Sequence, residues 1–427
     1  MGNDTTSEIC VLGMGYIGLP TAAMFAANGF RVHGVDTNPE VVATIGRGDI
    51  HIEEPGLKTL VRGAVSSGML RVGEEPVPAS LFIIAVPTPL TSDKKADMRA
   101  VDAATRALLP VLRPGNTVVL ESTSPPGTCR NRIRPVLEAA GWKVGETVFL
   151  AHCPERVLPG RILAELITND RVIGGMTPAC ARSAARWYAR LVDGEIFLTD
   201  ATTAELVKLA ENTYRDVNIA LANELASVCE VAGANFWEVQ RLANRHPRVN
   251  IHRAGPGVGG HCISVDPWFL VEMFPDRTPL IRAAREVNDA VPARVVAGVP
   301  GAAETVTLLG LAFKGNVDDC RESPAIAIAS LLEATGRVVR VYDPLVHRPP
   351  IPIAASLEES VRDSDLIILT TPHDVFHDID PARVAPLTRR RALIDTHDFL
   401  DHERWRAAGF DVMLRGTPSF PAYRDQR

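Results

Sequence analysis

Short apolar runs alternate with segments of helical apolar spacing along most of the chain. Residues 8–12 (EICVL) are an apolar run typical of a buried strand, and the segment PTAAMFAANG beyond them has helical spacing. RVHGVD predicts a second strand, which ends at Asp36. The apolar runs at residues 79–90 (ASLFIIAVPTPL) and 116–128 (NTVVLESTSPPGT) extend the same sheet. This alternation predicts an α/β fold built on a parallel sheet.

The C-terminal part of the chain repeats this design. ETVTLLGLAFKG predicts a strand that runs into a glycine loop, SPAIAIASLLEATG a helix, and RVVRVYD a strand ending at Asp343. SDLIILTTPHDVF and RALIDTHDFL have the same pattern as the two later strands of the first half. We therefore expect a second doubly wound unit at residues 301–427.

The segment between these units has a helical pattern. Apolar residues recur at helical spacing through residues 202–233, which predicts one long helix or two joined helices. Long helices of this kind often pair across a dimer. The expected organisation is a first doubly wound domain at 1–200, a central helical segment at 201–300 and a second doubly wound domain at 301–427, that is, two Rossmann-like domains joined by helices.

Composition narrows the function classes. The chain has 427 residues, too many for one core, with 46% hydrophobic and 22% charged residues. A net charge of −6 disfavours a general attraction to nucleic acid or membrane, and no apolar run is long enough to span a bilayer. The seven cysteines contain no CxxC pair and the N-terminus has no secretory pattern, which favours a cytoplasmic protein without disulfides or structural zinc.

The first strand leads directly into the glycine motif GMGYIG. Gly13 permits a tight turn, Gly15 allows a pyrophosphate to approach the backbone, and Gly18 allows close packing of helix and strand. The helix N-terminus supplies N–H groups and positive potential for phosphates. Asp36 can bind both ribose hydroxyls and would repel a 2′-phosphate, so the pattern predicts NAD rather than NADP.

Polar residues follow the later strands of the first half. Thr123 lies at the end of the strand predicted within residues 116–128, and Glu155 follows the apolar run VFLAHCP. Ligands bind at the carboxyl edge of open parallel sheets, which makes both residues candidates. Thr123 is also consistent with an ordinary turn hydroxyl, and Glu155 with either a general base or a surface charge.

The stretch GPGVGGHCISVDPW contains a cysteine in an unusual setting. Glycines at 255, 257, 259 and 260 leave space beside Cys262 and allow backbone N–H groups to face its thiol. Asp266 is positioned to orient water or take a proton. His261 is treated as structural, because side chains of sequence neighbours usually point apart. The alternative for Cys262 is a small buried hydrophobic residue.

Two pairs of polar residues are further candidates. Lys208 and Asn212 are four apart and share a helix face, although, taken alone, a snorkelling lysine and a helix-interior asparagine are the favoured explanation. Lys314 and Arg321 lie in the second glycine loop, where a basic loop suits a phosphate-bearing partner. Solvated surface charge is the alternative for that pair.

A nucleophilic cysteine beside a nicotinamide cofactor indicates aldehyde oxidation. Attack of the thiolate on an aldehyde gives a thiohemiacetal, hydride loss gives a thioester, and water releases the acid. An alcohol oxidation alone needs no thiol. The two chemistries together convert a primary alcohol into an acid and reduce two NAD.

Seven collinear motifs resemble the UDP-glucose/GDP-mannose dehydrogenase family over nearly the whole chain. They are VLGMGYIGLP, AVPTPL, ESTSPPGT, CPERVLPG, ENTYRDVNIALANELA, GPGVGGHCISVDPWFL and GLAFKGNVDDCRESPA. The resemblance is closest to the branch that acts on UDP-N-acetylhexosamines. It implies two Rossmann-like domains, a homodimer, NAD as cofactor, and oxidation of the 6-hydroxymethyl group of a UDP-sugar, with UDP-N-acetyl-D-mannosamine as first candidate.

The resemblance also implies residue roles. Cys262 corresponds to the nucleophile, Asp266 to water activation, Lys208 and Asn212 to oxyanion stabilisation, and Thr123 and Glu155 to water positioning and base catalysis. For the cofactor it implies Gly13, Gly15, Tyr16, Ile17, Gly18, Asp36, Pro87, Thr88, Thr123 and Arg321. For the substrate it implies Glu155, Arg156, Val157, Lys208, Asn212, Arg248, Gly259 and Lys314, with Arg321 also near the nucleotide-sugar phosphates.

Two departures from the family pattern bear on the substrate. Ser124 occupies a position where many relatives carry valine, and Val265 replaces the lysine of UDP-glucose dehydrogenases. The second departure favours the N-acetylhexosamine branch without selecting the sugar, so UDP-N-acetylglucosamine and UDP-glucose stay open. Two more distant alternatives are a two-electron 3-hydroxyacid-type dehydrogenase and a non-catalytic NAD-binding redox sensor.

Overall fold

The computed structural model describes residues 8–421 and divides into two compact units. Unit 1 contains the residues up to Glu211 together with Glu272–Phe274, and unit 2 contains residues 212–271 and those from Pro275 onward. The central segment that the sequence sets apart at 201–300 therefore lies mostly within unit 2. The N-terminal residues 1–7, on which the secretory-signal argument partly rests, lie outside the described residues.

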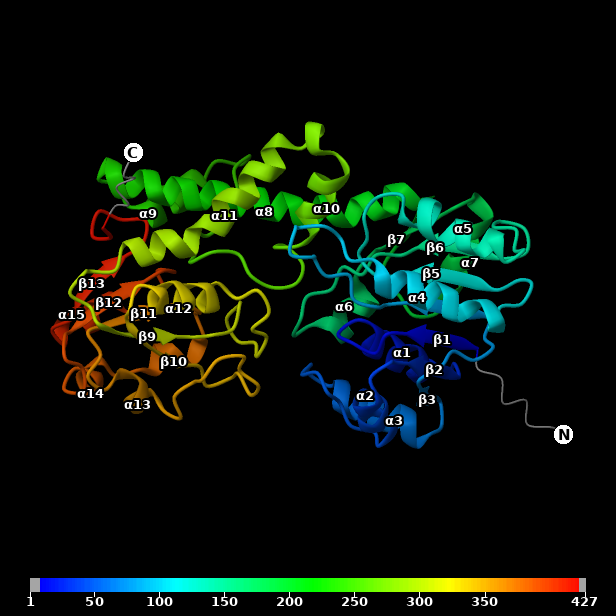
Figure 1. Cartoon of the computed structure of the whole chain (residues 1–427), viewed down its shortest axis with the longest axis horizontal. Helices are drawn as coiled ribbons and strands as arrows, with labels where there is room; N and C mark the ends of the chain where they lie inside the picture. Colours follow the sequence, from blue (N-terminus) through cyan, green and yellow to red (C-terminus); the bar gives the residue numbers. More distant parts are fainter. Residues whose placement is uncertain (1–7, 422–427) are drawn as a thin grey trace. The chain divides into compact units, whose positions relative to one another are not determined.

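Unit 1 is built on an eight-stranded sheet (Figure 1). Its strands are β1 Ile9–Leu12, β2 Val32–Val35, β3 Leu70–Gly73, β4 Leu81–Ile84, β5 Thr117–Leu120, β6 Phe149–His152, β7 Arg171–Gly175 and β8 Ile196–Asp200. They lie in the order β3-β2-β1-β4-β5-β6-β7-β8, and every adjacent pair is parallel except β6 and β7. The first six strands follow the order typical of dinucleotide-binding domains, which confirms the predicted doubly wound fold.

Helices cover both faces of this sheet. They are α1 Gly18–Ala27, α2 Pro39–Gly46, α3 Leu57–Ser66, α4 Arg99–Leu108, α5 Arg134–Ala139, α6 Ile162–Thr168 and α7 Pro178–Tyr188, with short helical turns η1 Leu109–Val111 and η2 Cys129–Ile133. Alternate strand residues enter different cores: Ile9 and Val11 pack with α1, α3 and α7, whereas Cys10 and Leu12 pack with α4 and α5. Burial on both faces explains why the central strands are continuous apolar runs.

Unit 2 contains a smaller parallel sheet. Its strands are β9 Thr305–Leu309, β10 Val338–Tyr342, β11 Leu366–Leu369, β12 Ala392–Asp395 and β13 Asp411–Leu414, in the order β10-β9-β11-β12-β13. All four strand pairs are parallel. This is the second common order of doubly wound sheets, with its switch point between β9 and β11, so the predicted second α/β unit is confirmed.

The helices of unit 2 and the helix entering it follow in chain order. They are α8 Ala201–Ala232, α9 Phe236–Ala243, α10 Asp266–Met273, α11 Pro279–Ala297, α12 Pro324–Ala334, α13 Leu357–Val361, α14 Pro381–Val384 and α15 His402–Ala407, with turns η3 Pro275–Arg277 and η4 Asp374–Asp378. α11 and α12 pack on one face of the sheet, and α13, α14 and α15 on the other. The segment 202–233 forms one helix of 32 residues rather than two.

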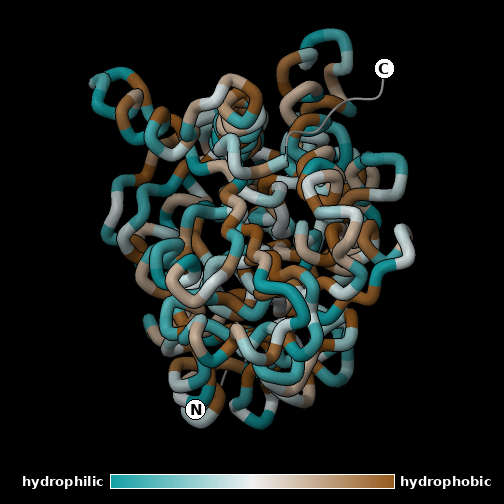
Figure 2. Tube along the Cα trace, turned by 90° about the vertical axis from the view of Figure 1, so that its left-hand side faces the viewer, coloured by the Kyte–Doolittle hydropathy of each residue, from teal (hydrophilic) through white to brown (hydrophobic). Residues whose placement is uncertain are grey.

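The hydropathy of the trace alternates along the chain. In Figure 2 many of the outward loops are hydrophilic. Among the described residues, no helix is both long and apolar enough to cross a membrane.

Candidate active site

The glycine turn after β1 has the geometry that the motif predicts. Gly13 has φ +92°, and a Cβ added there would lie 2.6 Å from the carbonyl oxygen of Ala85. A Cβ at Gly18 would lie 1.8 Å from the carbonyl oxygen of Gly13. At Gly15 an added Cβ would meet nothing within 4 Å, so the backbone is open at the position expected to face a pyrophosphate.

The first turn of α1 is suited to bind an anion. Ile17 precedes the helix and provides no side-chain cap, so no side-chain oxygen occupies the helix N-terminus, while the Leu19 N–H donates to the Gly15 carbonyl at 3.1 Å. The Asp36 carboxylate accepts hydrogen bonds from the N–H groups of Met14 (3.0 Å) and Asn38 (2.9 Å), which fixes its orientation beside the turn. Each carboxylate oxygen retains a further acceptor site, as a ribose hydroxyl requires.

The ends of β4 and β5 are joined by hydroxyl groups. Thr88 Oγ1 donates to the Thr123 carbonyl at 2.7 Å, and Ser122 Oγ donates to the Val86 carbonyl at 2.7 Å. Ser124 is buried and donates to the Ser122 carbonyl at 2.8 Å, so the serine that departs from the family pattern stabilises the turn. Thr123 is held at the carboxyl edge of the sheet, next to the segment that contains Pro87.

Glu155 belongs to a buried ion pair instead of the surface. Its Oε2 lies 2.7 Å from Nη1 of Arg171, and the two side chains are 6% and 3% exposed. Its Oε1 accepts the Arg156 N–H at 2.7 Å. The Arg156 side chain itself pairs with Glu211 at 2.7 Å, while Val157 packs against the core of unit 1.

A second buried carboxyl lies in the same region of unit 1. Glu121 accepts a hydrogen bond from the Tyr188 hydroxyl at 2.6 Å, and the Arg171 guanidinium lies 5.6 Å from the Tyr188 ring. Burial, followed by the charge of Glu155, raises the pKa of Glu121 to about 7. Sequence reasoning missed Arg171, although an arginine at the start of the apolar run RVIGG was a visible signal.

Lys208 and Asn212 lie one turn apart on α8, as predicted. Lys208 is 9% exposed, and no hydrogen bond or ion pair joins its ammonium group to another described residue. Asn212 is 6% exposed, and its Nδ2 donates to Oδ2 of Asp266 at 2.5 Å. Asp266 begins α10, and its N–H donates to the Cys262 carbonyl at 2.8 Å.

The Cys262 loop packs closely against the loop that follows β9. A Cβ at Gly259 would lie 2.6 Å from the Glu322 carbonyl oxygen, and one at Gly260 would lie 2.8 Å from the Phe313 ring. Gly260 also has φ +84°, and its N–H donates to the Arg321 carbonyl at 3.0 Å. The glycines therefore bring two backbone segments together, which corrects the expectation that they chiefly leave space beside the thiol.

His261 also differs from expectation. Its Nδ1 lies 2.9 Å from Sγ of Cys262, because the turn at 260–266 folds these adjacent side chains toward each other. Two further hydrogen bonds close the turn: the Val265 N–H donates to the Cys262 carbonyl, and Ser264 Oγ donates to the Gly260 carbonyl. The assumption that neighbouring side chains point apart is wrong here.

The seven cysteines differ in exposure. Cys10, Cys129, Cys153, Cys180 and Cys229 are buried, and only Cys262 and Cys320 are partly exposed. Burial, together with the charges of Asp343, Asp319 and Asp318, raises the pKa of Cys320 to about 12. Cys262 instead lies beside an imidazole. The surroundings of a reactive thiol are therefore found at Cys262.

The basic loop of unit 2 is held by a buried aspartate and histidine. Asp343 Oδ2 accepts the Leu311 N–H at 2.6 Å and lies 2.9 Å from Nε2 of His373. Nδ1 of His373 accepts the Asn316 N–H at 2.9 Å, so Nε2 carries the proton that is donated to Asp343. Sequence reasoning noted Asp343 as a strand end and missed His373. The exposed Lys314 lies within this loop, at the switch point of the sheet.

Arg321 and Arg248, which the sequence predicts to bind the cofactor and the substrate, make other contacts in the structure. Arg321 forms a fork with Asp319, with Nε and Nη2 at 2.9 and 2.6 Å from its carboxylate oxygens. Arg248 is exposed in the turn after α9, and its N–H donates to His246 Nδ1 at 3.4 Å. Neither contact involves another predicted site residue.

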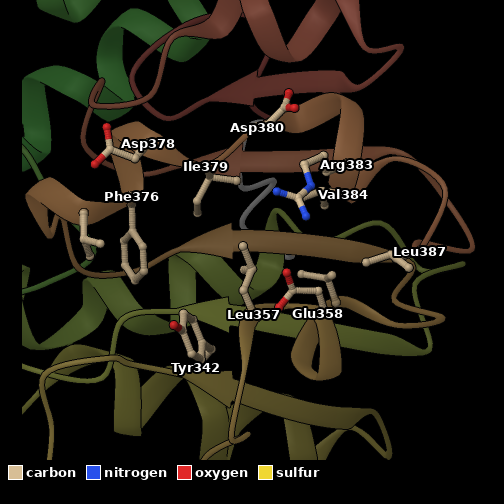
Figure 3. A pocket seen from close by; sticks show the side chains of 12 residues that line it. Tyr342, Leu357, Glu358, Phe376, Asp378, Ile379, Asp380, Arg383, Val384 and Leu387 are labelled. Carbon is tan, nitrogen blue, oxygen red and sulfur yellow. The ribbon is translucent and has the colours of Figure 1, made fainter.

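Two further features lie apart from the predicted residues. A hollow of ≈ 250 Å³ in unit 2 is lined by Tyr342, by residues of α13 and α14, and by Phe376 and Ile379 (Figure 3). In unit 1, Cys129, His152 and Glu205 each place one potential metal-ligand atom within 4.8 Å of the others. Glu205 already accepts the N–H groups of Gly127 and Cys129, at 2.5 and 2.9 Å.

Known proteins resemble this chain over nearly its whole length. It is 45% identical over 430 residues to the UDP-N-acetyl-D-mannosamine dehydrogenase of Methanococcus maripaludis, covering 97% of this chain and 98% of that protein. It is 47% identical over 413 residues to the NDP-N-acetyl-D-galactosaminuronic acid dehydrogenase of Ralstonia nicotianae, covering 93% and 97%. The UDP-D-ManNAc dehydrogenase structure from Pyrococcus horikoshii has a TM-score of 0.90 and 39% identity, over 96% of this chain and 100% of that chain.

Three family domains match in order along the chain. Residues 7–192 match the NAD binding domain, 202–290 the central domain, and 307–402 the UDP binding domain. Together with the glycine turn, the second doubly wound unit and the Cys262 loop, these matches establish what kind of protein this is: the chain is an NAD-dependent enzyme that belongs to the UDP-glucose/GDP-mannose dehydrogenase family.

Proposed function

We propose that this enzyme oxidises the 6-hydroxymethyl group of a UDP-N-acetylhexosamine to the uronic acid, with UDP-N-acetyl-D-mannosamine as the first candidate substrate. Relatives named for this substrate cover almost the whole chain, and one named for an N-acetylgalactosaminuronic acid is equally similar. The same chemistry on UDP-N-acetylglucosamine or UDP-glucose is the alternative.

The observation that carries the proposal is the setting of Cys262. It is a partly exposed thiol in contact with an imidazole. The loop that contains it leads into α10, whose first residue, Asp266, accepts a hydrogen bond from Asn212. The five buried cysteines lack the exposure of Cys262. A two-electron 3-hydroxyacid-type dehydrogenase would have no use for this thiol.

Three features fit a bound dinucleotide. The backbone is open at Gly15, α1 begins without a side-chain cap, and the Asp36 carboxylate is held by a backbone N–H group. Gly13, Tyr16, Ile17 and Gly18 would hold the cofactor in that turn, and Pro87, Thr88 and Thr123 at the strand ends. NAD, when bound, accepts hydride in both oxidations. The Arg321 contact to NAD is part of the same proposal and requires a guanidinium edge beyond the one that faces Asp319.

The protein groups act on the substrate as follows. Cys262 attacks the aldehyde carbon to form a thiohemiacetal, and after oxidation a water molecule cleaves the thioester. Asp266 takes a proton from that water. Lys208 and Asn212 stabilise negative charge on the reacting oxygen, because a fixed ammonium and amide are most effective where water is excluded.

The remaining predicted residues act as a base or bind the substrate. Glu155 serves as base and is paired with Arg171. The exposed Lys314 and Arg321 face the substrate phosphates. Arg248, Gly259, Arg156 and Val157 complete the proposed substrate contacts. We further propose that the enzyme acts in the cytoplasm as a homodimer.

The number of NADH formed per sugar tests this proposal. With UDP-N-acetyl-D-mannosamine and excess NAD, we expect two NADH and one uronic acid for each sugar consumed. Cys262→Ser should form at most one NADH per sugar, because the alcohol step needs no thiol. Cys320→Ser, the other partly exposed cysteine, should retain the wild-type ratio. One NADH per sugar from the intact enzyme would support the two-electron alternative instead.

A further inference from the structure

His261 contacts the atom that reacts. Its Nδ1 lies 2.9 Å from Sγ of Cys262, within reach of a proton that the two atoms can share. The contact depends on the Gly260 backbone, whose φ of +84° turns the chain, and on the Ser264 hydroxyl, which donates to the Gly260 carbonyl. The loop backbone therefore brings the two side chains to the same side of the turn.

The charged groups around this pair come from two segments. Asp319 and Arg321 belong to the loop that packs on Gly259 and Gly260, and Asp266 starts α10 one turn after the cysteine. Burial pushes the pKa of Asp319 upward, but hydrogen bonds and charge from Arg321, with a smaller contribution from His261, hold it below its usual value. The imidazole thus contacts the thiol through Nδ1 and also interacts electrostatically with the Asp319 carboxylate.

Cys262, His261 and Asp319 thus have the arrangement of a nucleophile, a base and a group that stabilises the protonated base. Asp319 is ionised near neutral pH and favours a positive imidazole. A positive imidazole in turn favours the thiolate, which is the nucleophilic form of cysteine. Asp266 accepts a hydrogen bond from Asn212 and is assigned to the later water step.

We propose that His261 is a catalytic residue that takes the proton of Cys262 before the thiolate attacks the aldehyde, with Asp319 as its positioning residue. The inference rests on the proposed role of Cys262 as nucleophile. The S–H bond breaks and an Nδ1–H bond forms; then the sulfur electron pair forms the S–C bond as the carbonyl π pair moves to oxygen. The imidazolium proton neutralises that oxygen, which gives a thiohemiacetal and a neutral imidazole.

Alkylation of Cys262 tests this inference without any sugar substrate. The rate of labelling by iodoacetamide is measured on the Cys262 peptide by mass spectrometry, from about pH 5 to about pH 10, in the wild type and in His261→Gln. Because the imidazole stabilises the thiolate, we expect the midpoint of the labelling profile to rise by at least about one pH unit in the variant. Near pH 6.5 the labelling rate should fall ~10-fold.

Controls separate this effect from a general disturbance. His347→Gln removes an exposed histidine far along the chain and should leave the profile unchanged. Thermal unfolding shows whether His261→Gln is folded, and His261→Asn carries the same test if it is not. Profiles of the wild type and of a folded variant that superimpose would overturn the inference. A shifted profile with only one NADH per sugar would keep the thiol–imidazole pair and reject the proposed function instead.

Discussion

Gly259 and Gly260 have no room for a side chain. The carbonyl oxygen of Glu322 and the ring of Phe313 occupy the positions where a Cβ would lie. The sequence pattern around Cys262 was therefore correctly identified as special, but for an incomplete reason. Close packing fixes the thiol loop against the loop after β9, and the fixed loop in turn determines which groups surround the sulfur.

Gly259→Ala tests this packing role. Its Cβ would lie 2.6 Å from a backbone oxygen, so the loop must shift. We expect a loss of about 1–3 kcal/mol in stability from overpacking. We also expect kcat/KM for the sugar to fall by at least ~10-fold, since small displacements of a reacting group have large kinetic effects. Thermal unfolding and steady-state NADH formation measure both.

Gly301→Ala is the matched control. Gly301 is exposed, and an added Cβ would meet nothing within 4 Å. Its stability should remain within about 0.5 kcal/mol of the wild type, with unchanged activity. If Gly259→Ala behaves like this control, the loop is adaptable and the packing argument fails.

At the scale of elements, the strands that sequence predicts best are those buried on both faces. The runs ICVL, LFII and LIIL each became a completely buried strand at the centre of its sheet. β7 was not anticipated, because Arg171 at its start and two glycines at its end leave only two apolar side chains between them. Its antiparallel pairing with β6 depends on the path of the connecting chain, which no local pattern reports.

In the candidate site, too, local motifs predict some residues and tertiary contacts determine the others. The motifs identified Cys262, Asp266 and Asn212, and Lys208 at the expected helical spacing. The partners that determine their chemistry were not predictable: Arg171 meets Glu155 from a different strand, and Asp319 approaches His261 from a different loop. Such pairs depend on tertiary contacts between segments that are far apart in the sequence.

β6 ends in a histidine whose burial makes the stability of the fold sensitive to acid. Neither ring nitrogen of His152 makes a hydrogen bond of normal geometry. Burial lowers its pKa to about 3, although the Leu120 carbonyl acts in the opposite direction. The unfolded chain takes up this proton near pH 6.5, whereas the folded chain does not. The free energy of unfolding should therefore fall by about 1.4 kcal/mol per pH unit from about pH 6.5 toward about pH 3.

His152→Phe should remove this contribution. We expect its thermal midpoint to exceed that of the wild type by a margin that grows as the pH falls from about 7 to about 5. His347→Gln, at an exposed site, should retain the wild-type dependence. A variant that is less stable at every pH, together with zinc in the purified wild type, would show instead that Cys129, His152 and Glu205 hold a metal ion.

At the scale of the whole molecule, α8 presents an apolar stripe. Tyr214, Leu221 and Val228 recur at intervals of seven residues and are 56%, 45% and 59% exposed, and Val231 is 77% exposed. Residues seven apart lie on one side of a helix, as in the seam of a coiled coil. A second copy of this chain, bringing the same stripe, would cover these side chains in a symmetric dimer.

Leu221→Glu tests the proposed dimer, because it places a charge at the centre of the stripe. Two such charges would face each other across a twofold axis without a partner, so the variant should sediment as a monomer at concentrations where the wild type is a dimer. Val338→Glu makes the same kind of change at an equally accessible residue of β10, 56% exposed, and should remain dimeric. If the Leu221→Glu protein sediments like the wild type, the stripe on α8 does not form the dimer interface. Sedimentation velocity of the three proteins therefore determines whether the longest helix of the fold also assembles the enzyme.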